Sequence, residues 1–168
     1  LSPAKLDGKR DQNSLILCKK SLFGAEAVEV TDQICARLPE NAPVAPGDIF
    51  GVSLTSTDGT PFVLVSFHGD TNGLATIPVV KAITEEVAAR ENPTLLVGLD
   101  ANAHYRGKPG KKLLASEFLE FLPTVDLSSC FGDGAQANQL AHTTFNSRTI
   151  LQPQLQKAVR LTERETSE

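Results

Sequence analysis

The order of hydrophobic patterns along the 168-residue chain predicts an α/β domain or a layered α+β domain. Three observations carry this prediction: two strand-like segments around an Asp-Gly turn, a helical apolar spacing directly after them, and a further apolar run of strand length. The length suits one domain over residues 1–168, and a hydrophobic fraction of 40% is ordinary for a chain that buries a core.

The N-terminal part is expected to contain one strand and one helix. The short apolar run at residues 14–18 predicts the strand. A short helix is expected over residues 27–38, where Ile34 and Leu38 are four residues apart and share a face. Three prolines between residues 39 and 47 then predict a loop.

The strongest local signal is a hairpin. Residues 49–54 and 61–67 are strand-like, and Asp58-Gly59 between them favours a tight turn. Alternation divides the side chains of the second strand between two faces, with Val63, Val65 and Phe67 on one and Leu64 and Ser66 on the other.

A helix and a strand are expected after the hairpin. Apolar residues recur at three- and four-residue steps over 77–90, which predicts a helix that ends before Asn92-Pro93. Residues 94–99 are almost continuously apolar, as in a strand buried on both faces. We therefore expect 49–54, 61–67 and 94–99 to be neighbouring strands of one sheet, with the helix packed on it.

The C-terminal part is expected to be helical with one long loop. The pattern predicts a helix over 113–122, a polar loop over 128–141 and a last helix over 151–165.

Composition and charge limit the classes of function. The net charge of −4 argues against a dedicated nucleic-acid binder, but it leaves room for an enzyme that acts on a small phosphate ester. No apolar run reaches membrane-spanning length and no signal-peptide core is present, so we expect a soluble protein without a membrane-spanning segment. Three widely spaced cysteines, none in a CxxC pair, make a zinc site improbable and favour a reducing intracellular compartment. Because the chain contains no Met, we expect a processed product, a trimmed fragment or part of a longer protein.

Polar side chains gather where two predicted strands end. His68-Gly69-Asp70-Thr71-Asn72 follows one strand and Asp100-Ala101-Asn102 follows the next. Polar groups at strand ends commonly face a crevice where ligands bind. There a carboxylate can activate water, an imidazole can transfer a proton and an amide can hold a phosphate oxygen. The alternative is that the Asp and Asn residues only cap helices or form turns.

This succession of hairpin, strand ending in His68, helix and strand ending in Asp100-Ala101-Asn102 resembles the endonuclease/exonuclease/phosphatase superfamily. That superfamily includes deoxyribonucleases, abasic-site endonucleases, inositol-phosphate phosphatases, deadenylases and sphingomyelinases. His68 matches the His of its Thr-His-Leu strand, and Asp100 and Asn102 match its Gly-Asp-Phe-Asn strand. Thr144-Phe145 resembles a Thr-aromatic element that follows, so the resemblance covers residues 11–147.

The resemblance implies a layered β-sandwich flanked by helices (α/β/β/α), of which this chain would hold the central portion. It also implies Mg²⁺-dependent hydrolysis of a phosphoester. Asp100 would orient or deprotonate the attacking water, Asn102 would bind the scissile phosphate, and His68 would stabilise charge or act as an acid. The residues expected to bind the substrate are Asp70, Asn72, Arg106 and Thr144.

The chain also departs from the pattern of the superfamily. Phe67 and Gly69 replace the usual Thr and Leu around His68, and Leu99 separates Gly98 from Asp100. The metal-binding Gln-Glu and the C-terminal Ser-Asp-His are absent, so this chain alone lacks the expected ligand Glu and catalytic His, and the metal ligands are unknown.

Two functions of different class follow from these departures. The first is a phosphodiesterase, nuclease or phosphatase in the parent protein, with the isolated chain inactive. The alternative is a non-catalytic interaction module of the same fold, whose partners would be the rest of its own domain or a larger assembly. A calcineurin-type phosphatase, suggested by His-Gly-Asp at 68–70, is less favoured because its other motifs are absent.

The substrate stays open among nucleic acid, nucleotide, inositol phosphate and lipid phosphoester. The acidic balance and the few aromatic residues disfavour a surface that stacks nucleic-acid bases. A local run of cations could meet a phosphate, although a solvated loop is the more common role for such a run. These cations are Arg106, Lys108, Lys111 and Lys112.

Overall fold

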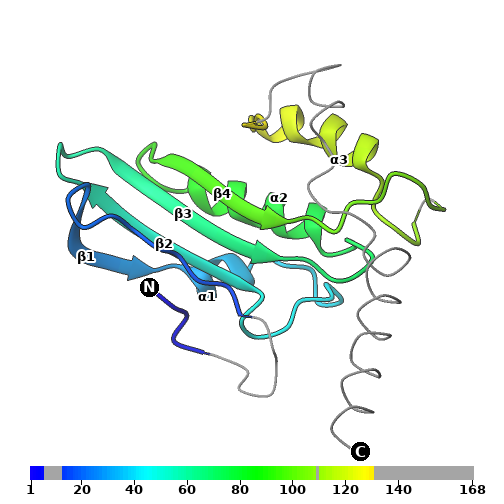
Figure 1. Cartoon of the computed structure of the whole chain (residues 1–168), viewed down its shortest axis with the longest axis horizontal. Coiled ribbons are helices and arrows are strands. Elements are labelled where there is room, and N and C mark those ends of the chain that lie inside the picture. The colour runs from blue at the N-terminus through cyan, green and yellow to red at the C-terminus, as the bar shows by residue number, and fades with distance from the viewer. Residues whose placement is uncertain (6–12, 109, 131–168) are drawn as a thin grey trace, which may run out of the picture. The chain divides into compact units, whose positions relative to one another are not determined.

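The computed structural model describes residues 1–5, 13–108 and 110–130 (Figure 1). Leu1–Leu127 form one compact unit, and Ser128–Glu168 form a second, of which only the first three residues are described. The helix expected over 151–165, most of the loop expected over 128–141, and Thr144 lie outside the described residues. No helix in the described part is long and apolar enough to cross a membrane.

The described strands form one mixed sheet in the order β1-β2-β3-β4. β2 (Ile49–Ser56) pairs antiparallel with both β1 (Phe23–Glu29) and β3 (Pro61–His68), while β4 (Thr94–Asp100) is parallel to β3. The chain reaches β4 through helix α2 (Thr76–Ala88), as a parallel connection requires. The predicted hairpin and the predicted neighbouring strands are therefore confirmed, and the chain belongs to the α+β class.

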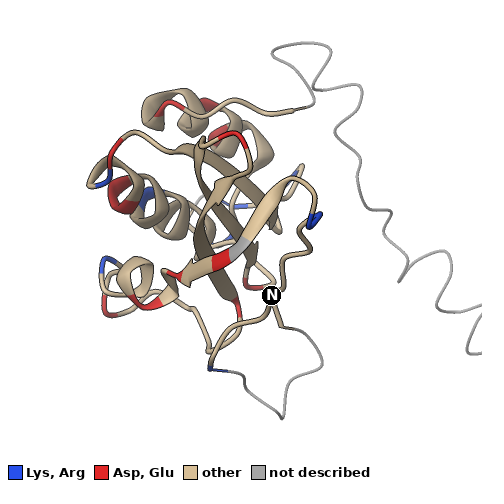
Figure 2. Cartoon of the chain, turned by 90° about the vertical axis from the view of Figure 1, so that its left-hand side faces the viewer, with Lys and Arg blue, Asp and Glu red and all other residues tan. Residues whose placement is uncertain are grey.

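Two helices cover one face of this sheet, and the main core lies between them and the strands (Figure 2). Val63, Val65 and Phe67 of β3 are buried there against α2, as the alternation predicts. The short helix α1 (Thr31–Cys35) adds Ile34, which is fully buried. Each buried aliphatic side chain of this size contributes about 1.5–3 kcal/mol, so this face holds the fold together.

A smaller apolar cluster lies on the opposite face of the sheet, which we call the outer face. Phe50, Val52 and Leu54 of β2 are buried there, and Ile16 and Cys18 pack against them. The strand predicted over 14–18 is wrong, because residues 13–19 cross the outer face without joining the sheet. Their alternation reflects contact with β2 on one side and solvent on the other.

The helix predicted over 27–38 is also wrong in its first part. Ala27, Val28 and Glu29 belong to β1 and pair with Leu54, Ser53 and Val52 of β2, respectively. Only Thr31–Cys35 is helical, and the loop predicted over 39–47 follows after a turn. Ala and Glu favour helices by themselves, but pairing with a central strand overrides that preference here.

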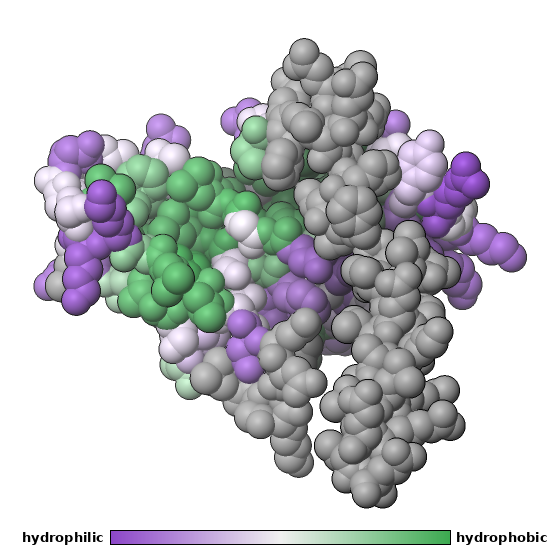
Figure 3. Space-filling view, viewed as in Figure 1, coloured by the Kyte–Doolittle hydropathy of each residue, from purple (hydrophilic) through white to green (hydrophobic). Residues whose placement is uncertain are grey.

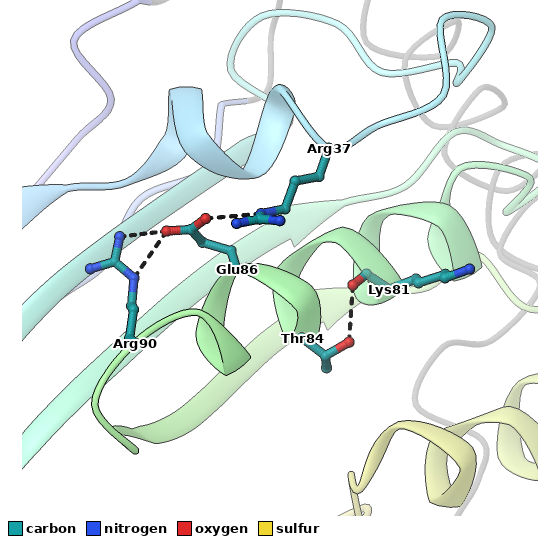
Figure 4. Close-up of polar contacts among 5 residues, drawn as sticks. All are labelled: Arg37, Lys81, Thr84, Glu86 and Arg90. Carbon is teal, nitrogen blue, oxygen red and sulfur yellow. Dashed lines mark hydrogen bonds and ion pairs between the residues drawn. The ribbon is translucent and has the colours of Figure 1, made fainter.

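Helices α1 and α2 are tied together by a buried carboxylate (Figure 4). Glu86 of α2 accepts hydrogen bonds from Arg90 Nη2 at 2.6 Å and from Arg37 Nε, just after α1, at 2.9 Å. Burial alone would raise the pKa of Glu86, but the bonds from Arg90 and Arg37 outweigh burial and lower it. The ion cluster therefore keeps a buried charge satisfied and fixes how α1 sits on α2.

The strand β4 is exposed on its outer face rather than buried on both faces. Leu95, Val97 and Leu99 pack on the core, but Leu96 is 54% exposed. β4 lies at the end of the strand order, so nothing in the described residues pairs with its second edge. The continuous apolar run therefore does not mean burial on both sides.

The last described elements are helix α3 (Ala115–Phe121) and the 3₁₀ helix η1 (Leu122–Val125). The helix expected over 113–122 begins two residues later than predicted. Leu113 is buried and donates its N–H to the carbonyl of Asn72 at 2.8 Å, which holds it outside the helix.

Candidate functional site

The parallel pairing of β3 and β4 brings two of the predicted site residues together. His68 and Asp100 are register partners at the carboxyl ends of these strands. His68 Nε2 lies 4.0 Å from Asp100 Oδ2, and the two side chains are 34% and 55% exposed. The structure therefore places these two predicted site residues on neighbouring strands at one end of the sheet.

This pair borders a shallow hollow on the outer face. Ser66 and Gly98 lie two residues before His68 and Asp100, and they are also register partners. A Cβ added to Gly98 would meet no atom within 4 Å, so the floor of the hollow is open at this position. The N-terminal segment closes one side with Asn13, Ser14 and Leu15.

A single carbonyl fixes the position of that segment beside His68. Asp48 O accepts hydrogen bonds from Ser14 Oγ at 2.7 Å and from His68 N at 2.9 Å. Ser14 is buried, so both bonds are shielded from water. The end of β3 and the wall of the hollow are therefore held by the same group.

Asn102 lies in the turn after Asp100 and does not continue the strand. Its φ of 45° is left-handed, so the chain is not extended from Asp100 to Asn102 and the two side chains do not share a strand face. Its Nδ2 donates to the carbonyl of Gly69 at 2.8 Å, which links the turn after β4 to the turn after β3. One N–H of this amide remains for another acceptor.

The side chain of Asp70 accepts hydrogen bonds from the backbone. Its Oδ2 accepts the N–H of Asn72 at 3.0 Å, and its Oδ1 accepts the N–H of Ala75 at 2.8 Å, directly before α2. Both oxygens are therefore occupied by the turn that leads into the helix. The Asn72 side chain is exposed, and its carbonyl holds Leu113. Asp70 therefore follows the alternative that these Asp and Asn residues cap helices or form turns.

The remaining predicted site residues are not part of this pair. Arg106 is exposed on the loop after His104, and its guanidinium lies 5.6 Å from the ring centroid of Tyr105. Thr144 lies outside the described residues.

The described residues do not make a magnesium site. No group of three His, Cys, Asp or Glu side chains suited to hold a metal ion occurs in the part of the chain that the structure describes. Mg²⁺ needs oxygen ligands in near-octahedral geometry, and Asp100 would supply one carboxylate next to an imidazole.

The geometry of the pair suits one shared oxygen atom. At 4.0 Å the imidazole and the carboxylate are too far apart for a direct hydrogen bond. An oxygen atom at about 2.8 Å from each would fit between them. Such an oxygen could belong to a water molecule that passes a proton to one group while the other orients it.

Sequence reasoning missed the residues that shape the hollow. Ser66 and Gly98 could have been found, because residues two positions before His68 and Asp100 on paired strands share their face. Asn13, Ser14 and Asp48 carry no such signal, since only the folded chain brings them to this edge.

No protein-family model, curated protein or solved structure matches the chain. The resemblance to the phosphoesterase superfamily therefore rests on the motifs around His68 and Asp100.

Proposed function

We propose that the chain supplies the His68, Asp100 and Asn102 part of a metal-dependent phosphoester hydrolase site in its parent protein. The observation that carries the proposal is the facing of His68 and Asp100 across adjacent strand ends, on a hollow open to solvent. The remaining ligands would come from other sequence of the parent protein or from a partner chain, and the isolated chain would be inactive.

Each of the three residues has a chemical task that fits its contacts. Asp100 would orient or deprotonate the attacking water through Oδ2, because its Oδ1 already accepts the N–H of Asn102 at 3.0 Å. His68 would carry a proton or stabilise charge at the same oxygen. Asn102 would donate its remaining N–H to a phosphate oxygen, while its bond to Gly69 holds the amide still. The magnesium ion, when bound, would stabilise the charge that develops on the phosphate.

The outer face supports the proposed α/β/β/α sandwich. Figure 3 shows a hydrophobic area over the strands on the face turned to the viewer. Leu96 of β4 and, on the N-terminal segment, Leu15 and Leu17 are exposed, at 54%, 56% and 88%. Apolar area of this kind usually marks an interaction surface, and a second sheet packed on the outer face would cover it.

The test of the proposal is Asp100→Asn in the parent protein, assayed with Mg²⁺ on a small phosphodiester. We expect the rate to fall about 10²- to 10⁴-fold, the range of a general acid–base contribution, while the melting temperature stays nearly unchanged. Asp70→Asn is the matched control: it makes the same change in the neighbouring turn and should retain the rate at temperatures where the protein is folded. An unchanged rate for Asp100→Asn would contradict the proposal, and a large loss of stability would show that Asp100 has a structural role.

The alternative is a non-catalytic interaction module of the same fold. The exposed leucines of the outer face favour it, as does the lack of a three-ligand metal group in the described residues. Under this alternative the parent protein shows no hydrolysis with any phosphoester, and polar substitutions at Leu96 and Leu17 weaken its assembly instead.

A further inference from the structure

A second chemical feature lies beside the proposed site. Residues 105–112, which we call the basic loop, carry Arg106, Lys108, Lys111 and Lys112, and residues 101–116 contain no Asp or Glu. Within the described residues, none of the four cations has an acidic partner, and three of them are exposed. The acidic residues in Figure 2 are scattered over helices, strands and loops. The net charge of −4 therefore conceals a local excess of positive charge.

The ends of the basic loop are held together by the backbone. His104 N donates to the carbonyl of Leu113 at 2.8 Å, and Ala115 N donates to the carbonyl of His104 at 3.0 Å. These bonds hold the two ends of the basic loop together, so its cations lie on a short segment between fixed ends.

The closed loop is also tied to the turn after β3. His104 Nε2 donates to the carbonyl of Thr71 at 3.1 Å, and Leu113 N donates to that of Asn72. The loop therefore begins at the strand ends where His68 and Asp100 lie, as its position beyond β4 in Figure 1 shows.

The loop also carries the most exposed large aromatic side chain in the described residues. Tyr105 is 81% exposed, and the Arg106 guanidinium lies over its ring. An exposed ring next to cations can stack on a nucleobase while the cations contact phosphates.

We infer that the basic loop binds a single-stranded nucleic acid and presents its phosphodiesters to the His68–Asp100 edge. The presentation of phosphodiesters to His68 and Asp100 rests on the proposed function, whereas the binding of the nucleic acid does not. Four cations within eight residues, none with an acidic partner among the described residues, exceed what one small phosphate needs and suit a chain of successive phosphates. The tyrosine favours a strand with free bases over a lipid surface, because the loop carries no Leu, Phe or Trp for insertion.

The test measures binding of the full chain to a fluorescent single-stranded oligonucleotide of about 12 nucleotides, by anisotropy, with a chelator present to prevent hydrolysis. Lys108→Gln with Lys111→Gln should weaken binding about tenfold at low salt and reduce the slope of log K against log salt by about 1.4. Tyr105→Ala should weaken it about fivefold or more, and Tyr105→Phe should not. Lys19→Gln with Lys20→Gln removes the same charge elsewhere and should have little effect.

Several outcomes would overturn the inference. They are the absence of binding at low salt, an equal loss in the Lys19 and Lys20 variant, full competition by millimolar inorganic phosphate, or binding to anionic lipid vesicles in place of the oligonucleotide. Asp100→Asn separates this inference from the proposed function. If Asp100→Asn stops hydrolysis of a small diester in the parent protein while the oligonucleotide does not bind, only the inference fails. If substitutions in the basic loop weaken oligonucleotide binding but Asp100→Asn leaves hydrolysis intact, only the proposed function fails.

Discussion

Two turns with the same Asp-x-Asn sequence follow adjacent strands, and they use their aspartates differently. In both, the carboxylate accepts the N–H of the Asn two residues later at 3.0 Å. Asp70 gives its second oxygen to Ala75 N, which fixes the entry into α2. The second oxygen of Asp100 faces His68 at 4.0 Å.

This difference separates a structural aspartate from one that is available for chemistry. A carboxylate whose oxygens both accept backbone N–H groups is fixed by its turn, although each oxygen keeps a second lone pair. Asp100 keeps one oxygen on the side of the hollow, and the neighbouring Asn102 is held by Gly69 of the other turn. The turn after β3 thus supports the turn after β4, which carries the candidate chemistry.

The largest expected effect concerns catalysis by the chain alone. Purified residues 1–168 with Mg²⁺ should not hydrolyse bis(p-nitrophenyl) phosphate above the buffer rate. The reason is that the pair would lack the metal-ion stabilisation that normally lowers such barriers by many orders of magnitude. The release of nitrophenolate measures the rate of hydrolysis. Turnover that disappears with a chelator and with Asp100→Asn would show that the turn after β4 needs no further ligands.

The next largest effect is on stability, at the contact between the two turns. Gly73 has a φ of +70°, and an added Cβ would lie 2.7 Å from Ala101 O and 2.8 Å from Asn102 O. Gly73→Ala should therefore lower the free energy of unfolding by about 3–4 kcal/mol, from left-handed strain plus the clash. Urea denaturation measures this.

The matched control for Gly73 is Gly59, in the hairpin between β2 and β3. Its φ is +90°, but an added Cβ would meet nothing within 4 Å, so Gly59→Ala should cost only about 1–2 kcal/mol. Equal losses at the two positions would contradict the close contact between the turns after β3 and β4.

The two aspartates themselves should differ in stability. Asp70→Ala removes two charge-assisted hydrogen bonds at the start of α2 and should cost about 2–3 kcal/mol. Asp100→Ala removes one such bond on a side chain that is half exposed and should cost less than about 1 kcal/mol. Denaturant midpoints of both variants check this order. If Asp100→Ala were the more costly change, the assignment of the two roles would be reversed.

The fold could be predicted where the pattern is set by local chemistry. The Asp58-Gly59 turn, the alternation of β3 and the spacing of α2 each carry their own signal, and all three agree with the structure. The first part of the helix expected over 27–38 failed because β1 gains its stability from β2, which local propensity does not report.

The candidate site could be predicted in part. His68 and Asp100 each follow a predicted strand, and the parallel pairing of β3 and β4 brings these two strand ends to one edge. The separate role of Asp70 could not be predicted, because the sequence around it matches that of Asp100 and only the position of Ala75 distinguishes them. The open floor at Gly98 depends equally on neighbours that are distant in sequence.

The smallest expected effect concerns a third aspartate with the same local bond. Asp58 accepts the N–H of Thr60 at 3.0 Å, two residues later, and also the hydroxyl of Ser56. The Ser56 hydroxyl, followed by the Thr60 backbone N–H, lowers the pKa of Asp58 from 3.8 to about 2. Asp58 is exposed in the hairpin and far in sequence from the two strand-end turns, so it shows what such a turn contributes when structure is its only task.

The pH dependence of Asp58→Asn isolates that contribution. Because the folded pKa lies below the unfolded value, the ionised carboxylate stabilises the fold above about pH 4, and this stabilisation is lost as the pH falls toward about 2. The wild-type chain should therefore be slightly more stable than Asp58→Asn at neutral pH, and the difference should shrink below about pH 4. Urea unfolding of both proteins between about pH 3 and 7 measures the gap, since other acid-sensitive groups affect both equally. High salt should reduce the gap, because the side chain is exposed to solvent. A stability difference between the two proteins that is constant down to about pH 3 would mean that the charge of Asp58 does not stabilise the turn. The hydrogen bonds would then form equally well with an amide or a protonated acid, and the charge of an aspartate in such a turn would be available for chemistry.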